Sequence, residues 1–283
     1  MIPYTVWQRG TDTYPGQLTQ IQSPPAELHA YGRPETLHAP CVAIVGTRHP
    51  TPYGARVTRE IAKALAQRGA CVVSGLAAGI DGYAHQAALD VGGRTVAVLG
   101  AGIDEVYPRI HTALYRNIAR EGLILSEHGP GTKPFRGCFP RRNRVIAGLA
   151  SVTIVVEAGV KSGALITANY AVESGRTVAA VPGPIESAQS YGTNHLIRDG
   201  ANVIASVEDA LMLLGMAHVV VRDQQPELQG DEATVWAAIE PGSTTDQLVA
   251  KTGLPVERCL VAITKLELND LVECLLSGEI RRR

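Results

Sequence analysis

The stretch CVAIVGTRHPTPYGARVTREIAKALAQRGACVV, residues 41–73, decides the fold class of this chain. It begins and ends with short apolar, largely β-branched runs, at 41–45 and 70–73, and the intervening residues 54–68 have the apolar spacing of a helix. Strands that are apolar on both faces and alternate with helices are typical of a parallel sheet covered by helices on both sides. The stretch therefore predicts a strand–helix–strand unit of an α/β fold.

The same alternation continues on the C-terminal side of this unit. Apolar runs predict further strands at 95–99, 123–125, 152–156 and 177–181, and helical spacing recurs at 82–91, 110–121, 141–149 and 163–174. We therefore predict a doubly wound α/β domain with a mostly parallel sheet over residues 41–216. Residues 1–40, which proline and glycine interrupt, are expected to be an irregular lead-in that packs on this domain.

The C-terminal residues predict a second, smaller domain. The segment 217–230 ends in polar residues and is interpreted as a linker. Helices are then expected at about 231–240, from Ser243 to about 252 and from 255 onward, with Ser243 and Asp246 at a spacing similar to a capping box. The third helix would direct Val256, Leu260, Ile263 and Leu266 to the core, and 271–276 and 279–283 would form a hairpin. This order over 231–283 suggests a winged helix.

Composition restricts the classes of function. Of the 283 residues, 45% are hydrophobic and 19% charged, which is the profile of a globular protein with a substantial core. The net charge of −1 gives no overall attraction to nucleic acid or membranes, so a phosphate-binding site would need locally clustered basic residues. Five cysteines without a CxxC pair argue against a disulfide framework and a structural zinc site. Because no signal-like or membrane-spanning run is found, the chain is expected to be cytoplasmic and to engage no membrane.

Glycine-rich turns follow three of the predicted strands, at 46–48, 74–81 and 100–104. In an open α/β sheet, ligands bind at the carboxyl ends of the strands, where N–H groups at helix N-termini favour anions. The candidate phosphate contacts at these and the next strand end are Thr47, Arg48, Ser74, Gly75, Lys161 and Ser162. No turn matches a Walker A loop or the dinucleotide fingerprint. The alternative is that the glycines only permit tight turns and that Lys161 is a solvated loop lysine.

The most informative segment is KPFRGCFPRRNR, residues 133–144. It contains both phenylalanines of the chain and five basic residues without an acidic one. The basic residues are Lys133, Arg136, Arg141, Arg142 and Arg144. Basic side chains interleaved with aromatic rings suit single-stranded nucleic acid, because any base can stack on such a ring with about 1–3 kcal/mol. Phe139 is the better candidate for stacking and Phe135 for the core. The alternative is buried rings and surface ion pairs.

The sequence contains no recognisable catalytic constellation. Its eight histidines show neither an HExxH nor a Cys/His metal spacing, and Ser74 is not part of a GxSxG motif. Asp81, Asp104 and Glu157 follow predicted strands and are expected to accept backbone N–H groups or to pair with arginines. We therefore expect no enzyme, no metal and no cofactor.

These motifs together resemble the DprA/Smf family over nearly the whole chain. The matching segments are VGTR (45–48), SGLAAGID (74–81), GAGID (100–104) followed by Tyr107-Pro108, Ser126-Glu127, FPRRNRVIAG (139–148), EAGVKSGALITA (157–168), VPG (181–183) and GTN (192–194). The resemblance implies an extended Rossmann-like core that forms a homodimer and binds single-stranded DNA without strong sequence preference. It also implies protection of incoming strands in natural transformation and help in loading the RecA recombinase. The DNA-contacting positions carried over would be Arg48, Arg136, Phe139, Arg142 and Lys161.

The chain departs from the family pattern at both ends. Only some 13 residues precede Tyr14, so a helical module present in many relatives is expected to be missing or truncated. The winged-helix segment 230–283 carries nine acidic and six basic residues, a net charge of −3. Because a DNA-reading helix needs basic residues near phosphates, we expect this module to serve protein contact or regulation.

Two other classes of protein remain as alternatives. Phosphoribohydrolases that process nucleotides share this kind of sheet, but their PGGxGTxxE motif is absent from the sequence. A transcriptional regulator would bind duplex DNA through the winged helix.

Overall fold

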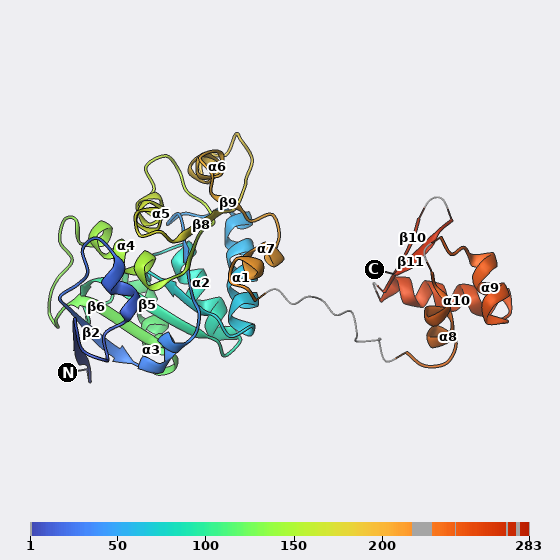
Figure 1. Cartoon of the computed structure of the whole chain (residues 1–283), viewed down its shortest axis with the longest axis horizontal. Helices are drawn as coiled ribbons and strands as arrows, with labels where there is room; N and C mark the ends of the chain where they lie inside the picture. The colour runs from blue at the N-terminus through green and yellow to red at the C-terminus, as the bar shows by residue number, and fades with distance from the viewer. Residues whose placement is uncertain (1, 217–227, 241, 270, 276–277, 283) are drawn as a thin grey trace. The chain divides into compact units, whose positions relative to one another are not determined.

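The computed structural model describes residues 2–216, 228–240, 242–269, 271–275 and 278–282. The chain divides into two compact units, Met1–Ala217 and His218–Arg283 (Figure 1). Residues 217–227, which make up most of the predicted linker, lie outside the described residues.

The N-terminal unit is built on one nine-stranded sheet with the order β1-β2-β6-β5-β4-β3-β7-β8-β9. From β6 to β9 in this order all neighbours are parallel, whereas β1 and β2 form an antiparallel pair beside β6. The strands are β1 (Thr5–Gln8), β2 (Glu27–Gly32), β3 (Cys41–Val45), β4 (Cys71–Ser74), β5 (Arg94–Gly102), β6 (Leu123–His128), β7 (Val152–Val155), β8 (Thr177–Ala180) and β9 (Asn202–Val203). The predicted fold class, a mostly parallel doubly wound sheet, is confirmed.

Helices cover both faces of this sheet. One face carries α1 (Pro52–Gln67), α2 (Ile80–Asp90), α3 (Thr112–Glu121) and α7 (Val207–Leu213), and the other α4 (Cys138–Leu149), α5 (Gly163–Glu173) and α6 (Tyr191–Arg198). The central strands are apolar on both sides: Val42 and Ile44 of β3 pack in the core under α1 and α2, and Ala43 and Val45 in the core under α4 and α5. This two-sided burial is why their sequences are continuous apolar runs.

Residues 1–40 correct the prediction of an irregular lead-in. They contain β1 and β2 of the sheet and the 3₁₀ helices η1 (Gly16–Gln20) and η2 (Pro34–His38). Trp7, Tyr14, Leu18 and Leu28 are buried in the core under α4. The strands were not predicted because an antiparallel pair at the edge needs no continuous apolar run, and β1 is only four residues long with one buried position.

The C-terminal unit contains α8 (Gly230–Ala238), α9 (Thr245–Thr252), α10 (Val256–Leu268) and the hairpin β10 (Val272–Cys274) and β11 (Ile280–Arg282). The predicted order of three helices and a hairpin is confirmed. The capping box belongs to Thr244 and Gln247 instead of Ser243 and Asp246, because the Ser243 hydroxyl accepts the N–H of Glu240. The core face of α10 consists of Cys259, Ala262, Ile263 and Leu266, so Val256 and Leu260, which were expected inside, are exposed.

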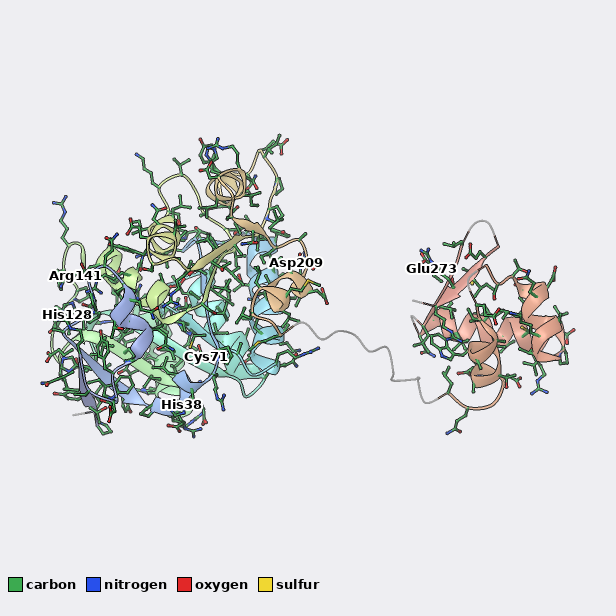
Figure 2. All side chains as sticks on the ribbon, in the orientation of Figure 1. His38, Cys71, His128, Arg141, Asp209 and Glu273 are labelled. Atoms are coloured by element: carbon green, nitrogen blue, oxygen red, sulfur yellow. The ribbon has the colours of Figure 1, made fainter. Side chains whose placement is uncertain are left out.

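Figure 2 shows the side chains of the described residues on the ribbon, in the orientation of Figure 1. Cys71 is fully buried, whereas Arg141 extends from the surface of α4. All five cysteines carry free thiols. Among the described helices, none combines the length and apolar character that crossing a bilayer requires.

Candidate nucleic-acid interface

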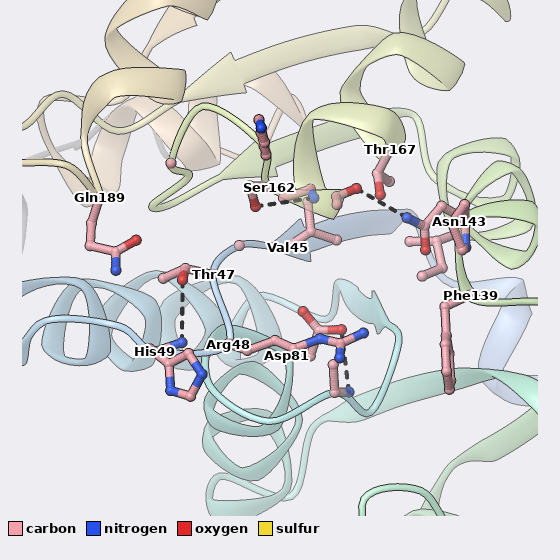
Figure 3. A pocket seen from close by; sticks show the side chains of 18 of the residues that line it. Val45, Thr47, Arg48, His49, Asp81, Phe139, Asn143, Ser162, Thr167 and Gln189 are labelled. Carbon is pink, nitrogen blue, oxygen red and sulfur yellow. Dashed lines mark hydrogen bonds between the residues drawn. The ribbon is translucent and has the colours of Figure 1, made fainter. Parts of the chain in front are cut away.

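An open cavity of about 470 Å³ lies at the carboxyl ends of the central strands (Figure 3). From β3 the chain steps through β4 and β5 to one side of the sheet and later through β7 to β9 on the other side. Such a reversal leaves a crevice between the two strand ends, here those of β3 and β7, where α/β proteins bind ligands. The cavity is lined by Val45, Gly46, Thr47, Arg48, His49, Ala77, Asp81, Phe139, Pro140, Arg142, Asn143, Ile146, Gly159, Val160, Lys161, Ser162, Gly163, Ala164, Thr167 and Gln189.

Arg48 and Phe139 meet on one side of the cavity. The Arg48 guanidinium lies 5.6 Å from the centroid of the Phe139 ring, within the range of a cation–π contact. The ring is half-buried and lies 5.3 Å from the ring of Tyr107 at an angle of 31°. It rests on the backbone of Gly100, where a Cβ atom would stand 2.7 Å from the Phe139 Cδ1 atom. A cation and a supported aromatic ring are therefore presented together.

Lys161 and Ser162 line the cavity from the loop between β7 and α5, and Figure 3 shows Ser162 on the side away from Arg48. Ser162 is the N-cap of α5 and accepts the N–H of Ala164 at 3.3 Å. Asn143 donates to the Gly163 carbonyl at 3.1 Å and so ties the loop to α4. Lys161 is exposed and has no ion-pair partner among the described residues. The hydrogen bonds of Ser162 and Asn143 fix the loop, while the ammonium group of Lys161 stays free to bind phosphate.

Arg142 lines the same cavity but serves the protein interior. Its guanidinium donates to the carbonyl of Gly75 at 2.8 Å and to that of Val98, and it stands beside the buried carboxyl group of Asp81. Burial lowers the pKa of Arg142 to about 10, with Asp81 opposing the shift. Burial likewise raises the pKa of Asp81, against the charge of Arg142. Arg142 thus links the end of β4 to the middle of β5, and its contact with DNA stays a prediction.

The three strand-end acids accept backbone N–H groups, as predicted. Asp81 accepts those of Gly75 at 3.1 Å and Ala77 at 3.4 Å, and Asp104 that of Gly131 at 2.7 Å. Glu157 accepts both the N–H and the hydroxyl of Thr51, at 2.9 and 2.5 Å. Through these contacts the three carboxylates hold the loops in position.

The basic segment 133–144 contributes fewer free cations than its sequence suggests. Arg144 is buried in an ion pair with Glu127, with N–O distances of 2.7 and 2.6 Å, so the expected DNA contact there is corrected. Lys133 is exposed but pairs with Glu105 at 2.5 Å. Arg141 is exposed and lines a different cavity, beside Ile21. Arg136 is exposed in the loop before α4 and does not line the cavity at the strand ends.

Two further expectations from this region change. Phe135 is exposed and lies edge-on to His128 at 5.3 Å, so it is not a core residue. Ser74 is fully buried and donates to the carbonyl of Ile44 at 2.7 Å, which removes it as a phosphate contact. Gly75 is buried as well and borders a smaller cavity of about 100 Å³ beside Arg48 and Phe139. Of the twelve predicted residues, the cavity at the strand ends brings together Thr47, Arg48, Phe139, Arg142, Lys161 and Ser162.

Several residues of the cavity were not predicted. His49, Asn143, Thr167 and Gln189 line it with polar side chains. His49 and Gln189 were detectable in principle, since each lies in a loop that follows a parallel strand. The described residues contain no cluster of three or more His, Cys, Asp or Glu side chains that could hold a metal ion.

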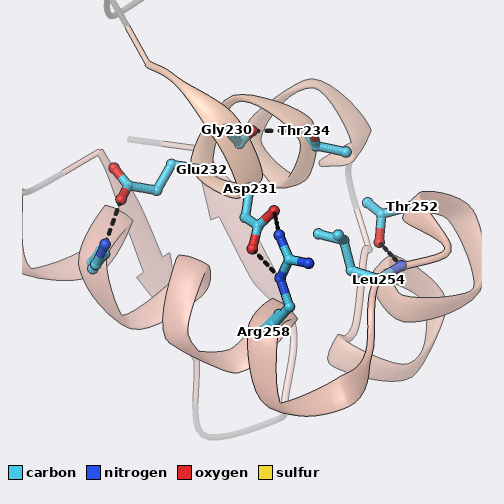
Figure 4. A network of polar contacts seen from close by, with 8 residues as sticks. Gly230, Asp231, Glu232, Thr234, Thr252, Leu254 and Arg258 are labelled. Carbon is cyan, nitrogen blue, oxygen red and sulfur yellow. Dashed lines mark hydrogen bonds and ion pairs between the residues drawn. The ribbon is translucent and has the colours of Figure 1, made fainter.

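In the C-terminal unit, intramolecular ion pairs occupy the basic side chains of α10 (Figure 4). Arg258 binds both carboxylate oxygens of Asp231, at 2.6 and 2.7 Å, and Lys265 contacts Glu232 at 3.0 Å. Both pairs link α10 to α8. This helix therefore offers little unpaired positive charge to a phosphate backbone.

Comparison with known proteins identifies relatives of both units. The family model "DNA recombination-mediator protein A" matches residues 5–215, and "DprA winged helix domain" matches residues 221–278. The protein Smf of Synechocystis sp. is 48% identical over 223 residues, which are 77% of this chain and 56% of the relative. The chain thus spans little more than half the length of that curated relative.

Solved structures of two proteins resemble this chain. DNA processing protein A from Streptococcus pneumoniae has a TM-score of 0.71 and 41% identity, covering 74% of each chain. DNA processing protein A from Helicobacter pylori, whose structure is described in terms of single-stranded DNA binding, has a TM-score of 0.70 and 33% identity. That match covers 77% of this chain and 98% of the other.

Proposed function

Because this chain belongs to the DNA recombination-mediator protein A family, we propose that it binds single-stranded DNA in the cavity between β3 and β7. The observation that carries the proposal is the grouping of Arg48, Phe139 and Lys161 around one open cavity at the reversal of strand order. The relative from Helicobacter pylori, described as a single-stranded DNA binder, supports it.

The chemistry of the cavity favours a single strand over a duplex. Stacking on Phe139 needs an unpaired base, and contributes about 1–3 kcal/mol whatever the base is. Arg48 and Lys161 supply charge from two different loops at the cavity, which suits successive phosphates. Nothing in this arrangement reads base edges systematically, so we expect little sequence preference.

We propose a mediator role in recombination instead of catalysis. In this role the protein protects incoming strands during natural transformation, acts as a homodimer in the cytoplasm, and helps load RecA. The strand-end acids Asp81, Asp104 and Glu157 are engaged with backbone or hydroxyl donors, which leaves the phosphoribohydrolase alternative without an evident general base. Release of free base from nucleoside monophosphates would contradict this role. Sedimentation of the full chain tests the homodimer, and strand exchange by RecA on protein-coated DNA tests loading.

We propose that the winged-helix unit contacts protein. The pairing of Arg258 and Lys265 with acids of α8 supports this, because those ion pairs would have to break before α10 could bind phosphates. A chain ending at residue 216 should then retain most of its affinity for single strands. If the shortened chain lost that affinity, or if the full chain bound duplex DNA of a specific sequence, the alternative function as a transcriptional regulator would be favoured.

The direct test is a titration with a short oligothymidylate. Neutralisation of about four phosphates gives a slope of log affinity against log salt of about −3, from roughly −0.7 for each phosphate. Arg48→Glu should weaken binding for every sequence and reduce the slope by about 0.7. Phe139→Ala should weaken binding with little change in slope.

A matched control is Arg94→Glu, an exposed charge reversal at the start of β5 and so at the amino ends of the strands. It should bind like the wild type. Equal affinities of wild type and Arg48→Glu, or affinity independent of salt, would refute the assignment of the cavity.

A further inference from the structure

The exposed side of α1 repeats the arginine–aromatic pairing of the cavity. Arg56 lies 5.8 Å from the ring centroid of Tyr53, and Arg59 lies 4.2 Å from that of Tyr83 on α2. Lys63, one turn after Arg59, completes a set that we name the α1 ridge: Tyr53, Arg56, Arg59, Lys63 and Tyr83. All but Tyr83, which is half-buried, are exposed.

The α1 ridge begins at the rim of the cavity. Arg48 and His49 line the cavity, and Thr51 caps the helix three residues after Arg48. The Tyr53 hydroxyl donates to the carbonyl of Pro182 at 3.1 Å, on the loop that also carries Gln189 into the cavity. Tyr53 thus stands where a chain leaving the cavity would pass.

The α1 ridge carries unbalanced positive charge. Its one acidic neighbour, Glu60, contacts Arg56 at 3.3 Å, while Arg59 and Lys63 form no ion pair with any described residue. From Arg56 to Lys63 the helix rises by about 10 Å, at about 1.5 Å per residue. Cations at this spacing, interleaved with aromatic rings, form the surface that non-specific single-strand binders use.

We propose that a single strand too long for the cavity leaves it past His49 and continues along the α1 ridge. This inference rests on the proposed function, since it extends the path of the same ligand. Arg56, Arg59 and Lys63 contact successive phosphates, and Tyr53 offers a ring on which a base stacks. Short strands occupy the cavity alone.

The experiment compares oligothymidylates of about 6 and about 20 nucleotides, within and beyond the usual size of one such site. The test variant is the triple substitution Arg56→Ala, Arg59→Ala, Lys63→Ala. The control triple is Arg33→Ala, Arg94→Ala, Arg120→Ala, which removes the same charge from exposed residues around a cavity at the amino ends of the strands.

Loss of three phosphate contacts reduces the salt slope for the long strand by about 2, at roughly 0.7 for each phosphate. Between 50 and 200 mM salt the long-strand affinity of the wild type should therefore fall about 20-fold more than that of the test variant. The control triple should behave like the wild type, and all three proteins should bind the short strand alike. Glu60→Gln should tighten long-strand binding.

The outcomes separate the two proposals. If the short strand binds and the test variant matches the control triple on the long strand, the ridge is overturned while the cavity stands. If the wild type binds neither strand, the proposed function itself fails. Equal weakening of short and long strands by the test variant also overturns the ridge, because it would mean a general effect on the fold or the cavity. The proposal for the ridge would also be overturned if the wild type bound a duplex more tightly than the long single strand.

Discussion

Replacing Arg142 by methionine is expected to destabilise the N-terminal unit far more than the same replacement of an exposed arginine. Although Arg142 lines the cavity assigned to DNA, it is only 5% exposed and its guanidinium donates to the carbonyls of Gly75 and Val98. Its charge is balanced by Asp81, which is also buried. Methionine provides a long side chain without donors or charge.

The magnitude follows from what the substitution leaves behind. Asp81 would keep its N–H donors from Gly75 and Ala77 but lose the nearby cation, and two carbonyls would lose a donor. A buried polar group that loses its hydrogen-bond partner costs about 1–3 kcal/mol, and the two carbonyls together with the uncompensated charge of Asp81 make up the total. Because Asp81 remains partly solvated by the backbone, we expect about 3–4 kcal/mol. Asp81→Asn alone should also destabilise, and the double variant should lose less than the sum by about 1–3 kcal/mol.

The chain offers a clean fluorescence assay for this effect. It has two tryptophans, Trp7 in β1 of the N-terminal unit and Trp236 in α8 of the C-terminal unit. In a Trp236→Phe background the buried Trp7 reports unfolding of the N-terminal unit alone during a urea titration. Arg141→Met, the neighbouring exposed arginine, serves as the control and should change stability by less than about 0.5 kcal/mol.

An additive double variant, or a loss below about 1 kcal/mol for Arg142→Met, would refute the reasoning. Such a result would mean that the Arg142 guanidinium is available to bind phosphate. In that case the substitution should instead weaken oligonucleotide binding and reduce its salt slope.

Three further predictions concern acid stability, the start of α1 and the aromatic platform. His85 is fully buried, and burial lowers its pKa to about 3 from 6.5. The stability that neutral His85 contributes is therefore complete above pH 6.5 and is lost as the pH falls toward 3, with a loss of about 2 kcal/mol at pH 5. In thermal melts between pH 7 and 5, the melting temperature of His85→Gln should fall less than that of the wild type. Glu157→Gln should cost about 1–3 kcal/mol in urea titrations, because the amide NH₂ group cannot accept from Thr51; an unchanged midpoint would contradict the role of Glu157 at this helix end. Gly100→Ala should displace the Phe139 ring and weaken short-strand binding about 10-fold with an unchanged salt slope, whereas Gly16→Ala, whose Cβ meets open space, should bind normally.

The sheet was predictable because its central strands satisfy a demand that local sequence expresses directly. A strand buried on both faces, such as β3 or β7, must be apolar throughout, and each such run was assigned correctly. Strands β1, β2 and β9 lie at or near the edges of the sheet, where one face or one side meets solvent, and their sequences carry no comparable constraint.

The location of the candidate site was predictable, whereas the set of residues that line it was less so. The strand ends identify where loops gather, but they do not tell which arginine points outward. In α4 the positions Cys138, Arg142, Val145 and Leu149 are spaced by four, three and four residues and share the buried face. That periodicity was available in the sequence and marks Arg142 as an inward residue. The pairing of Arg144 with Glu127 was not available, because it depends on the distance between α4 and the end of β6.

The short strand that closes one end of the sheet restricts how copies of this protein can associate. β9 has only two residues, Asn202 and Val203, both exposed. Two residues provide too few free backbone groups to template another strand, a means by which sheets avoid growing into fibres. If two protomers meet at this end, their cohesion must come from side-chain packing, which a single polar substitution at Val203 could abolish without disturbing either monomer.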